Sequence, residues 1–345
     1  MRILLIMDPL IPVPPRHYGG IERVVADLAN ELVHRNHTVT LWAAPGSQIH
    51  GATEPFGKEG EWTRWSNARN TMVVTARFLR RPHSYDVVHN FGRLAYLTTI
   101  LSRDFPKVQT YMRKVNPQNM RRATSLGARR LHYTAVSAAI RETGKPGGGD
   151  WSVIYNCASP EKYLCRADVD ARTAPLVFLG RLERCKGAHT AIRVAHRLNR
   201  RLILAGNLST LPEEREYFRT EIEPAIDGGL ISYLGPVDDS EKNNLLGRAA
   251  ALLLPIEWEE PFPVVLPEAL LCGTPVIAFR RGGVPEGIDS GLTGFVCDTF
   301  EQMTTAVCRL GELDRTACRA VAERRFSRKT IADEYEQLYI RLRAS

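Results

Sequence analysis

The sequence predicts an α/β protein built from two doubly wound domains, each a parallel sheet with helices on both faces. Three observations predict this fold class. A chain of 345 residues is long enough for two domains of ordinary size. Strand, helix and strand follow one another closely between residues 2 and 44, and again between residues 251 and 279. An irregular stretch from 157 to 173 separates two regions in which strands and helices alternate.

The composition is ordinary for a globular protein, because 44% of the residues are hydrophobic and 24% are charged. The apolar run from Met1 to Val13 is interrupted by Asp8 and lacks the small-residue cleavage site of a signal peptide. No stretch approaches the roughly 18 uncharged apolar residues of a membrane span. The seven cysteines form no Cys-x-x-Cys pair, which argues against a zinc site and a disulfide framework. We therefore expect a cytoplasmic protein with no metal site.

In the first half, apolar runs and helical periodicity predict six strands and three helices. The strands are expected over 2–7, 37–44, 86–90, 107–112, 133–137 and 151–156, and the helices over 21–32, 92–101 and 118–131. Residues 45–70 are predicted to form a polar loop. Its aromatic residues, Phe56, Trp62 and Trp65, are expected either to stack on a sugar or aglycone or to pack against the domain.

In the second half, the same signals predict strands over 176–180, 201–206, 231–235, 251–255 and 275–279. Helices are expected over 188–198, 212–225 and 239–249, with a short helix between the last two strands. The tail from 314 to 343 is predicted to be an amphipathic helix. The expected domains are residues 1–165 and 166–325, followed by a C-terminal helix over 326–345.

Two carboxylates mark the stretch from Pro255 to Glu286 as a candidate ligand site. Glu260 and Glu268 stand on either side of a turn that opens a short helix after the strand 251–255. Ligands of parallel α/β sheets lie at the carboxyl ends of strands, and a helix start offers N–H groups to a phosphate. Carboxylates suit hydroxyls, so the unit fits a nucleotide sugar. From the two glutamates alone, a buried crossover with capping and solvated carboxylates is the favoured alternative.

Other candidate residues also fall at strand ends or helix starts. Gly19 and Gly20 precede the helix 21–32, where glycine lets the backbone approach a ligand closely. Arg181 and Lys186 follow the strand 176–180 and can hold a diphosphate. His89 ends the strand 86–90 and is a candidate catalytic residue. The pattern Gly-x-Gly-x-x-Gly is absent, which weakens any dehydrogenase interpretation.

These residues carry a family resemblance. The two glutamates, followed by Ala-Leu-Leu-Cys-Gly-Thr-Pro-Val-Ile-Ala and Gly-Gly-Val-Pro-Glu, resemble the donor-site signature of retaining glycosyltransferase family 4. Residues 178–181 with Lys186-Gly187 resemble the family's phosphate-binding strand and loop, and residues 18–21 its first glycine loop. The resemblance implies the GT-B fold: two Rossmann-like domains facing across a cleft, with the acceptor on the first and the nucleotide sugar mostly on the second. It also implies that the C-terminal helix packs back on the first domain.

The implied reaction is transfer of a sugar, with retained anomeric configuration, from a nucleotide diphosphate donor to an acceptor hydroxyl. Glu268 would hold the ribose, and Glu260 would hold the transferred sugar or act as a nucleophile. Arg181 and Lys186 would stabilise the leaving phosphate as catalytic groups. Many members have His-x-His at His89, whereas this chain has Phe91 in the second place. The nucleotide-sugar site would comprise Gly19, Gly20, Arg181, Lys186, Val237, Glu260, Phe262, Pro263, Val264, Val265 and Glu268.

Pro263 stands where the family commonly has glycine, so one backbone N–H is missing from the expected anion-binding turn. A UDP-sugar is favoured over a GDP-sugar as donor, and no cofactor is expected beside it. The acceptor is expected to be a carbohydrate or natural product, as in antibiotic biosynthesis. A nucleotide-sugar epimerase of the same architecture and a lipid-linked-acceptor glycosyltransferase are the alternatives.

The basic charge is concentrated in the first half. Residues 1–150 contain 21 Lys and Arg against 11 Asp and Glu, while the rest contains 25 against 27. Within 113–145 the only acid is Glu142, although a solvated helix normally mixes charges. We expect this segment to meet a soluble anionic acceptor rather than nucleic acid, with an anionic membrane or a carrier-bound intermediate as alternatives. The residues concerned are Arg113, Lys114, Arg121, Arg122, Arg129 and Arg130.

Overall fold

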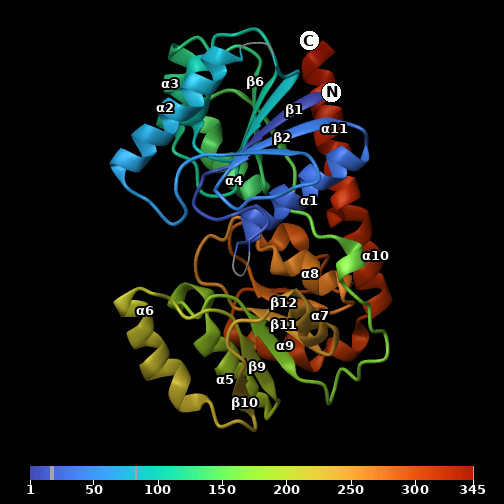
Figure 1. Ribbon diagram of the computed structural model, residues 1–345. Coiled ribbons are helices and arrows are strands. Elements are labelled where there is room, and N and C mark those ends of the chain that lie inside the picture. Colours follow the sequence, from blue (N-terminus) through green and yellow to red (C-terminus); the bar gives the residue numbers. More distant parts are fainter. Residues whose placement is uncertain (16–18, 82–83, 345) are drawn as a thin grey trace. The chain divides into compact units, whose positions relative to one another are not determined.

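The computed structural model describes residues 1–15, 19–81 and 84–344, which divide into two compact units (Figure 1). Unit 1 comprises Met1–Cys157 and Arg328–Ser345, and unit 2 comprises Ala158–Ser327. The chain thus leaves unit 1 inside the stretch predicted to be irregular, and returns to it before the last helix. Unit 2 is an insertion in the sequence of unit 1.

Unit 1 is a parallel sheet of seven strands in the order β3-β2-β1-β4-β5-β6-β7. The order reverses between β1 and β4, as in doubly wound folds. The strands are β1 (Arg2–Ile6), β2 (Thr38–Ala43), β3 (Ala52–Pro55), β4 (Val87–Asn90), β5 (Lys107–Tyr111), β6 (Leu131–Ala135) and β7 (Asp150–Val153). The helices are α1 (Gly20–His34), α2 (Arg64–Arg80), the 3-10 helix η1 (Leu94–Ile100), α3 (Pro117–Ser125), α4 (Ala138–Gly144) and α11 (Arg328–Ala344).

Alternate side chains of the central strands of unit 1 face opposite layers of helices, as the pleat requires. Leu4 and Ile6 of β1 share one buried cluster with Val74 and Phe78 of α2. On the other face, α11 lies beside α1, and the two helices are linked through Arg35, which donates to Glu336 at 3.0 Å. Both faces of the sheet are therefore covered, and the residues of the central strands are largely buried.

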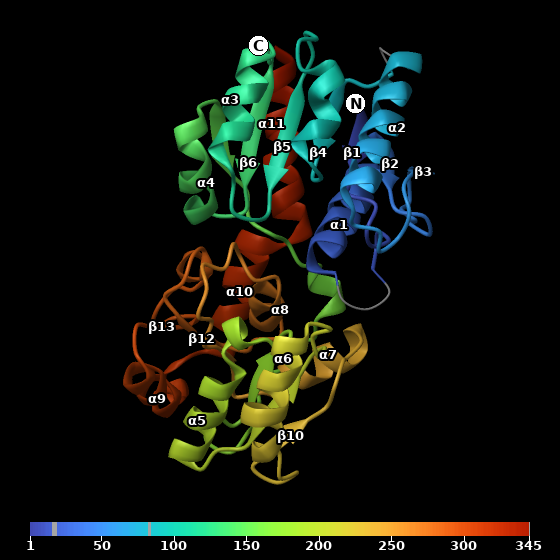
Figure 2. The same cartoon turned by 90° about the vertical axis from the view of Figure 1, so that its left-hand side faces the viewer.

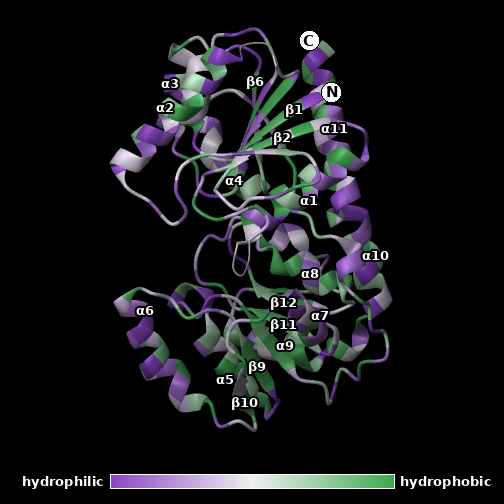
Figure 3. Ribbon diagram, viewed as in Figure 1, coloured by the Kyte–Doolittle hydropathy of each residue, from purple (hydrophilic) through white to green (hydrophobic). Residues whose placement is uncertain are grey.

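Unit 2 is a parallel sheet of six strands in the order β10-β9-β8-β11-β12-β13, with the reversal between β8 and β11. Figure 2 shows it from a second side, and Figure 3 shows the hydrophobic character of β11 and β12. The strands are β8 (Leu176–Leu179), β9 (Leu202–Ala205), β10 (Ile231–Tyr233), β11 (Ala251–Leu254), β12 (Val276–Phe279) and β13 (Gly294–Cys297). The helices are α5 (Ala188–Leu198), α6 (Pro212–Tyr217), α7 (Asp239–Gly247), α8 (Val265–Leu271), α9 (Phe300–Cys308) and α10 (Arg315–Phe326).

The predicted loop 45–70 is partly wrong, because it contains β3 and the start of α2. The short strand β3 is an exposed edge strand without an apolar run, so periodicity does not reveal it. The helix α2 begins after Thr63, whose side chain accepts a hydrogen bond from the Ser66 N–H at 3.0 Å. The Ser66 hydroxyl accepts one from the Thr63 N–H at 2.9 Å, which completes a capping box.

The predicted C-terminal helix is two helices, because Ser327 adopts an extended conformation between α10 and α11. The Ala158 N–H donates to the Phe326 carbonyl at 2.9 Å, so the two segments at the start and end of unit 2 are paired. The predicted helix 212–225 is helical along its length, but only its first part, α6, is α-helical. It continues from α6 as a π-helical turn over Phe218–Ile222 and a 3-10 turn over Glu223–Ala225.

Candidate functional site

The candidate donor site of unit 2 lies where the loops after β8 and β11 meet, at the reversal of strand order. These two strands are direct neighbours in the sheet, with Leu252 paired to Val177. The loop after β8 carries Arg181 and Lys186, and the loop after β11 carries Glu260. A crevice at the carboxyl ends of two such strands is the usual ligand site of a doubly wound sheet.

Two glycines, one in the loop after β8 and one in the loop after β12, allow close approach to the backbone of the segment after β11. Gly187 has a φ of +80°, and a Cβ there would lie 2.0 Å from the Pro255 carbonyl oxygen. Gly282 has a φ of +52°, and a Cβ there would lie 2.2 Å from the Glu260 carbonyl oxygen. That oxygen accepts a hydrogen bond from the Gly283 N–H at 2.8 Å. Any other residue at 187 or 282 would displace the backbone around Glu260.

Glu260, Lys186 and Trp258 form one polar cluster in this crevice. The Lys186 ammonium lies 2.5 Å from Glu260 Oε2, and the Trp258 indole N–H donates to the same oxygen at 2.6 Å. The Lys186 ammonium also lies 5.2 Å from the centre of the Trp258 ring. Only 8% of Glu260 is exposed, so its charge is offset by these two groups rather than by water. The sequence analysis did not single out Trp258, although it stands two residues before Glu260.

Arg181 lies in the same loop as Lys186 and is paired with a nearby acid. Its guanidinium donates to Glu183 Oε1 at 2.7 Å. Its side chain remains 36% exposed, whereas Glu183 is buried. Arg181 therefore presents a positive charge at the surface of the loop, held in orientation by a buried carboxylate.

Glu268 has different partners from Glu260. Its Oε1 accepts hydrogen bonds from the Lys242 ammonium at 2.5 Å and from the Tyr163 hydroxyl at 2.8 Å. Only 4% of Glu268 is exposed, and among the described residues its Oε2 has no hydrogen-bond partner. Lys242 belongs to α7 and Tyr163 to the segment predicted to be a linker. Neither was identified from the sequence, because nothing local links them to Glu268.

The backbone between the two glutamates is fixed by packing. Phe262 is buried, and its ring centre lies 5.5 Å from that of Phe326. Pro263 precedes Val264, and α8 begins at Val265, where the first N–H groups have no acceptor within the helix. The turn thus offers the amides of Val264 and Val265 but none at Pro263. Val237, half-buried, lies outside this turn, in the loop between β10 and α7.

The glycine loop of unit 1 directly precedes α1. Gly19 is the residue before the helix, and Gly20 is its first residue. A Cβ at Gly19 would lie 2.6 Å from Pro15 Cβ and 2.9 Å from the Glu22 carboxylate, so the turn has no room for a larger residue. Tyr18, which belongs to the same motif of residues 18–21, lies outside the described residues.

His89 occupies the core of unit 1 rather than a reactive position. Its side chain is fully buried, and its Nδ1 and Nε2 lie 2.5 Å from the Tyr339 hydroxyl and 2.6 Å from the Thr110 hydroxyl. Burial lowers the pKa of His89 well below the usual 6.5. Because both ring nitrogens are occupied within unit 1, we propose that His89 has a structural role instead of the catalytic role expected from the sequence.

This burial predicts a pH dependence of stability. The folded unit keeps His89 neutral, whereas the unfolded chain takes up a proton near pH 6.5, so stability is lost as the pH falls below that value. We expect the free energy of unfolding to fall by about 1.4 kcal/mol between pH 7.5 and 5.5 through this group alone. Urea unfolding of His89→Gln should show a correspondingly weaker pH dependence, and the exposed His50→Gln should not. An equal dependence of unfolding free energy on pH in the wild type, His89→Gln and His50→Gln would contradict this prediction.

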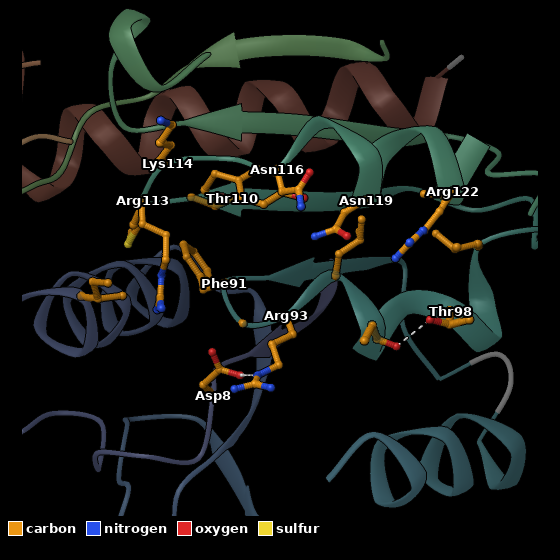
Figure 4. A pocket seen from close by; sticks show the side chains of 18 of the residues that line it. Asp8, Phe91, Arg93, Thr98, Thr110, Arg113, Lys114, Asn116, Asn119 and Arg122 are labelled. Atoms are coloured by element: carbon orange, nitrogen blue, oxygen red, sulfur yellow. Dashed lines mark hydrogen bonds and ion pairs between the residues drawn. The ribbon is translucent and has the colours of Figure 1, made fainter. Parts of the chain in front are cut away.

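Unit 1 contains a pocket of about 560 Å³ at the carboxyl ends of β1, β4 and β5 (Figure 4). Its wall includes Asp8 after β1, Phe91 and Arg93 after β4, and Arg113 after β5. Residues of α3 and η1 complete it, among them Arg122. The pocket thus lies at the carboxyl ends of the strands where the strand order of unit 1 reverses, just as the Glu260 cluster lies at the reversal in unit 2.

The aromatic residues of the predicted loop have three different environments. Phe56 is buried and packs edge-on against Tyr96. Trp62 lines the pocket, and the Arg93 guanidinium lies 3.9 Å from its ring centre. Trp65 is 87% exposed on α2. Phe56 therefore packs against the domain, and Trp62 is the one of the three that lines the pocket.

The basic residues of 113–130 also separate into two groups. Arg113, Lys114 and Arg122 line the pocket. Arg121 instead donates to the Pro146 carbonyl at 3.0 Å, and Arg130 donates to the Leu342 carbonyl. This division could not be predicted from the sequence, because it depends on which side chains line the pocket and which reach the Pro146 or Leu342 carbonyl.

Among the residues that the structure describes, no helix combines the length and the apolar composition that crossing a bilayer requires. The described residues also contain no group of three or more His, Cys, Asp or Glu side chains arranged to hold a metal ion.

Comparison with known proteins identifies both halves of the chain. The family described as Glycosyltransferase Family 4 matches residues 18–162, and that described as Glycosyl transferases group 1 matches residues 169–319. Glycogen synthase of Mycobacterium tuberculosis strain H37Rv is 32% identical over 99% of this chain and 94% of its own length. Both halves therefore match glycosyltransferases, and the similarity to one relative extends along almost the whole chain.

Solved structures agree with this similarity. AviGT4, a glycosyltransferase involved in avilamycin A biosynthesis, has 29% identity and a TM-score of 0.73, covering 99% of this chain and 98% of its own. HepE from Anabaena, solved with UDP-glucose, shares the fold at 20% identity with a TM-score of 0.75, covering 99% of this chain and 100% of its own. The two parallel sheets, each with one reversal of strand order, are the Rossmann-like domains expected from the sequence. The chain belongs to glycosyltransferase family 4 and has the domains of the GT-B fold.

Proposed function

We propose that this glycosyltransferase moves a sugar from a UDP-sugar to an acceptor hydroxyl with retention of anomeric configuration, using the Lys186–Glu260–Trp258 cluster of unit 2. The observation that carries the proposal is the position of this cluster. It lies at the β8–β11 reversal, where Gly187 allows the loop after β8 to approach the carboxyl end of β11 and brings Lys186 within reach of Glu260. Unit 2 would bind the nucleotide sugar, and unit 1 the acceptor.

The difficult event is departure of the nucleoside diphosphate from the anomeric carbon. The bond from that carbon to the phosphate oxygen breaks, and a bond to the acceptor oxygen forms on the same face. The acceptor proton passes to the leaving phosphate. Lys186 and Arg181 stabilise the negative charge that grows on the phosphate, because both are fixed in position before the reaction by Glu260 and Glu183.

Glu260 binds the transferred sugar in this scheme. Its Oε2 is held by Lys186 and Trp258, while among the described residues its Oε1 has no hydrogen-bond partner. That oxygen can accept a sugar hydroxyl. Trp258, which is 40% exposed, lies beside the same carboxylate, and an indole ring suits the apolar face of a hexose. This role needs no covalent sugar intermediate on Glu260.

Glu268 binds the ribose in the same scheme, through the oxygen that Lys242 and Tyr163 leave unoccupied. We expect Glu268→Gln to weaken UDP binding by about 1–3 kcal/mol, the range for hydrogen bonds to charged groups. Calorimetric titration of UDP measures this directly. Glu213→Gln, the same change at an exposed position of unit 2, serves as the control. Unchanged UDP affinity in a folded Glu268→Gln protein would rule out the ribose role.

The donor base is tested most simply by thermal stability. A nucleotide at 100 times its Kd stabilises the folded state by about 2.7 kcal/mol, which raises the Tm measurably. We expect UDP to raise it more than GDP. UDP-glucose, the ligand solved with HepE, is the first donor to incubate with the protein, and slow release of UDP without acceptor would show that unit 2 activates it.

A further inference from the structure

We propose that the pocket of unit 1 binds an acceptor that carries an anionic group, a phosphate or a carboxylate, beside its hydroxyls. This inference rests on the proposed function, because it names the class of molecule that receives the sugar. It assigns the anionic group to Arg122 and Asn119, and a hydroxyl of the acceptor to Asp8, with Arg113 adding positive charge at the Asp8 end.

The pocket has the position and size of a small-molecule site. Strand order in unit 1 reverses between β1 and β4, and the residues that follow these two strands form its floor. A volume of about 560 Å³ falls within the range of pockets that enclose small ligands. Phe91, Leu94 and Ala123 supply apolar surface, which suits the carbon skeleton of a sugar or natural product.

The charge lining this pocket is unbalanced. Four basic residues, Arg93, Arg113, Lys114 and Arg122, face one carboxylate, Asp8. The side chains of Arg113, Lys114 and Arg122 form no hydrogen bond and no ion pair at contact distance with any residue that the structure describes. Cations gathered in a concave surface without acidic partners raise the local concentration of anions and pair with them.

The side chains of two of these arginines extend into the pocket. Figure 4 shows Arg122 and Asn119 pointing toward the same space, while Arg113 descends beside Phe91 and Lys114 points away. A guanidinium with an adjacent amide offers several N–H donors to the oxygens of one phosphate or carboxylate. We therefore place the anionic group at Arg122 and Asn119, with Arg113 toward the Asp8 end.

Asp8 provides a second feature, a carboxylate oxygen that is buried and accepts no hydrogen bond of good geometry. Only 5% of this residue is exposed, and its Oδ1 accepts no hydrogen bond from any residue described. Arg93 Nε lies 3.6 Å from that oxygen, and the Arg93 guanidinium is held over Trp62. Burial raises the pKa of the Asp8 carboxyl, against the opposing effects of the Tyr96 hydroxyl, Arg93 and Arg113. A buried acceptor atom of this kind is normally satisfied, and a ligand hydroxyl would satisfy it.

The test compares matched neutral and anionic sugars by calorimetry. Glucose, glucose 6-phosphate and glucuronate are titrated into the wild-type chain, and inorganic phosphate is then used as a competitor. We expect each anionic sugar to bind at least about tenfold more tightly than glucose, since hydrogen bonds between charged groups contribute about 1.5–3 kcal/mol. Inorganic phosphate should displace the anionic sugars and leave glucose binding unchanged.

Four variants separate the two ends of the pocket. Arg122→Gln should reduce the preference for the anionic sugars by about tenfold, and Arg113→Gln, which removes charge from the Asp8 end, should reduce it less. Arg129→Gln, an exposed arginine of the same segment outside the pocket, should leave it unchanged. Asp8→Asn should weaken glucose and glucose 6-phosphate binding by the same factor, because it acts on a hydroxyl that both share.

The proposal is overturned if neither anionic sugar binds more tightly than glucose, or if Arg129→Gln has the same effect as Arg122→Gln. It is also overturned if the anionic sugars fail to bind while the protein sediments with phosphatidylglycerol vesicles and Arg122→Gln does not, because the cations would then serve a membrane. UDP binding is measured in parallel on the same preparations. Loss of the anion preference with UDP binding intact contradicts only this inference, whereas absence of UDP binding contradicts the proposed function.

Discussion

Replacing Lys186 with alanine is expected to lower kcat by about two to three orders of magnitude, with a much smaller effect on the Kd of the donor. The charge on the leaving phosphate develops only as its bond to the sugar breaks, so a group that neutralises it acts mainly on the transition state. The Lys186 ammonium is already held 2.5 Å from Glu260 Oε2, so it needs little reorganisation to stabilise the charge on the leaving phosphate. Rates of UDP release from the donor, with and without acceptor, and a separate donor titration measure the two quantities.

The same substitution leaves Glu260 buried without its cation, so a folding defect must be distinguished from a catalytic one. The Tm of the variant and its UDP affinity serve this purpose. Arg197→Ala, which removes an exposed cation from α5, should retain wild-type turnover. Arg181→Ala should behave like Lys186→Ala. Equal losses in kcat and donor affinity for both variants would mean that these residues bind the ground state and do not act selectively on the transition state.

Replacing Tyr339 with alanine should lower the free energy of unfolding of unit 1 by about 3–5 kcal/mol, the usual cost of deleting a large buried side chain. Tyr339 is fully buried, its hydroxyl lies 2.5 Å from His89, and its ring packs against that of Tyr335. Tryptophan fluorescence during urea unfolding reports largely on this unit, because four of the five tryptophans lie in it.

Two further variants serve as comparisons for Tyr339→Ala. Tyr339→Phe removes only the hydroxyl and should lower stability by about 1 kcal/mol, the net value of one hydrogen bond. Ile340→Ala changes the neighbouring, half-exposed position and should have a small effect. If Tyr339→Ala unfolded at the same urea concentration as Ile340→Ala, α11 would contribute little to the core of unit 1.

Most strands, and the loops that carry Lys186 and Glu260, could be predicted from the sequence because their signals are local. Buried parallel strands are short apolar runs, and each is followed by the loop that carries the chemistry. Lys186 and Glu260 belong to two such loops, and their contact follows once β8 and β11 are neighbours. The helix 188–198 was predicted with its observed bounds, because its apolar face is uninterrupted.

The remaining features could not be predicted because they depend on tertiary packing. Lys242 and Tyr163 meet Glu268 from distant parts of the chain, and no local pattern marks either as a partner. His89 is found at a strand end, as predicted, but the core formed with α11 encloses it. The break at Ser327 interrupts a stretch of good helix formers, since that residue pairs with Ala158 instead of continuing the helix.

The insertion of unit 2 into unit 1 has a consequence for biosynthesis. The ribosome completes all seven strands of the first sheet long before it makes α11, because the whole of 158–327 intervenes. Until then His89 and the sheet face around it lack the side chains of Tyr335 and Tyr339. One apolar face of the nascent first unit therefore stays uncovered until α11 has been synthesised. Unit 2 is contiguous in the sequence and can fold as soon as it leaves the ribosome. In this chain, the part made first is expected to reach its native state last.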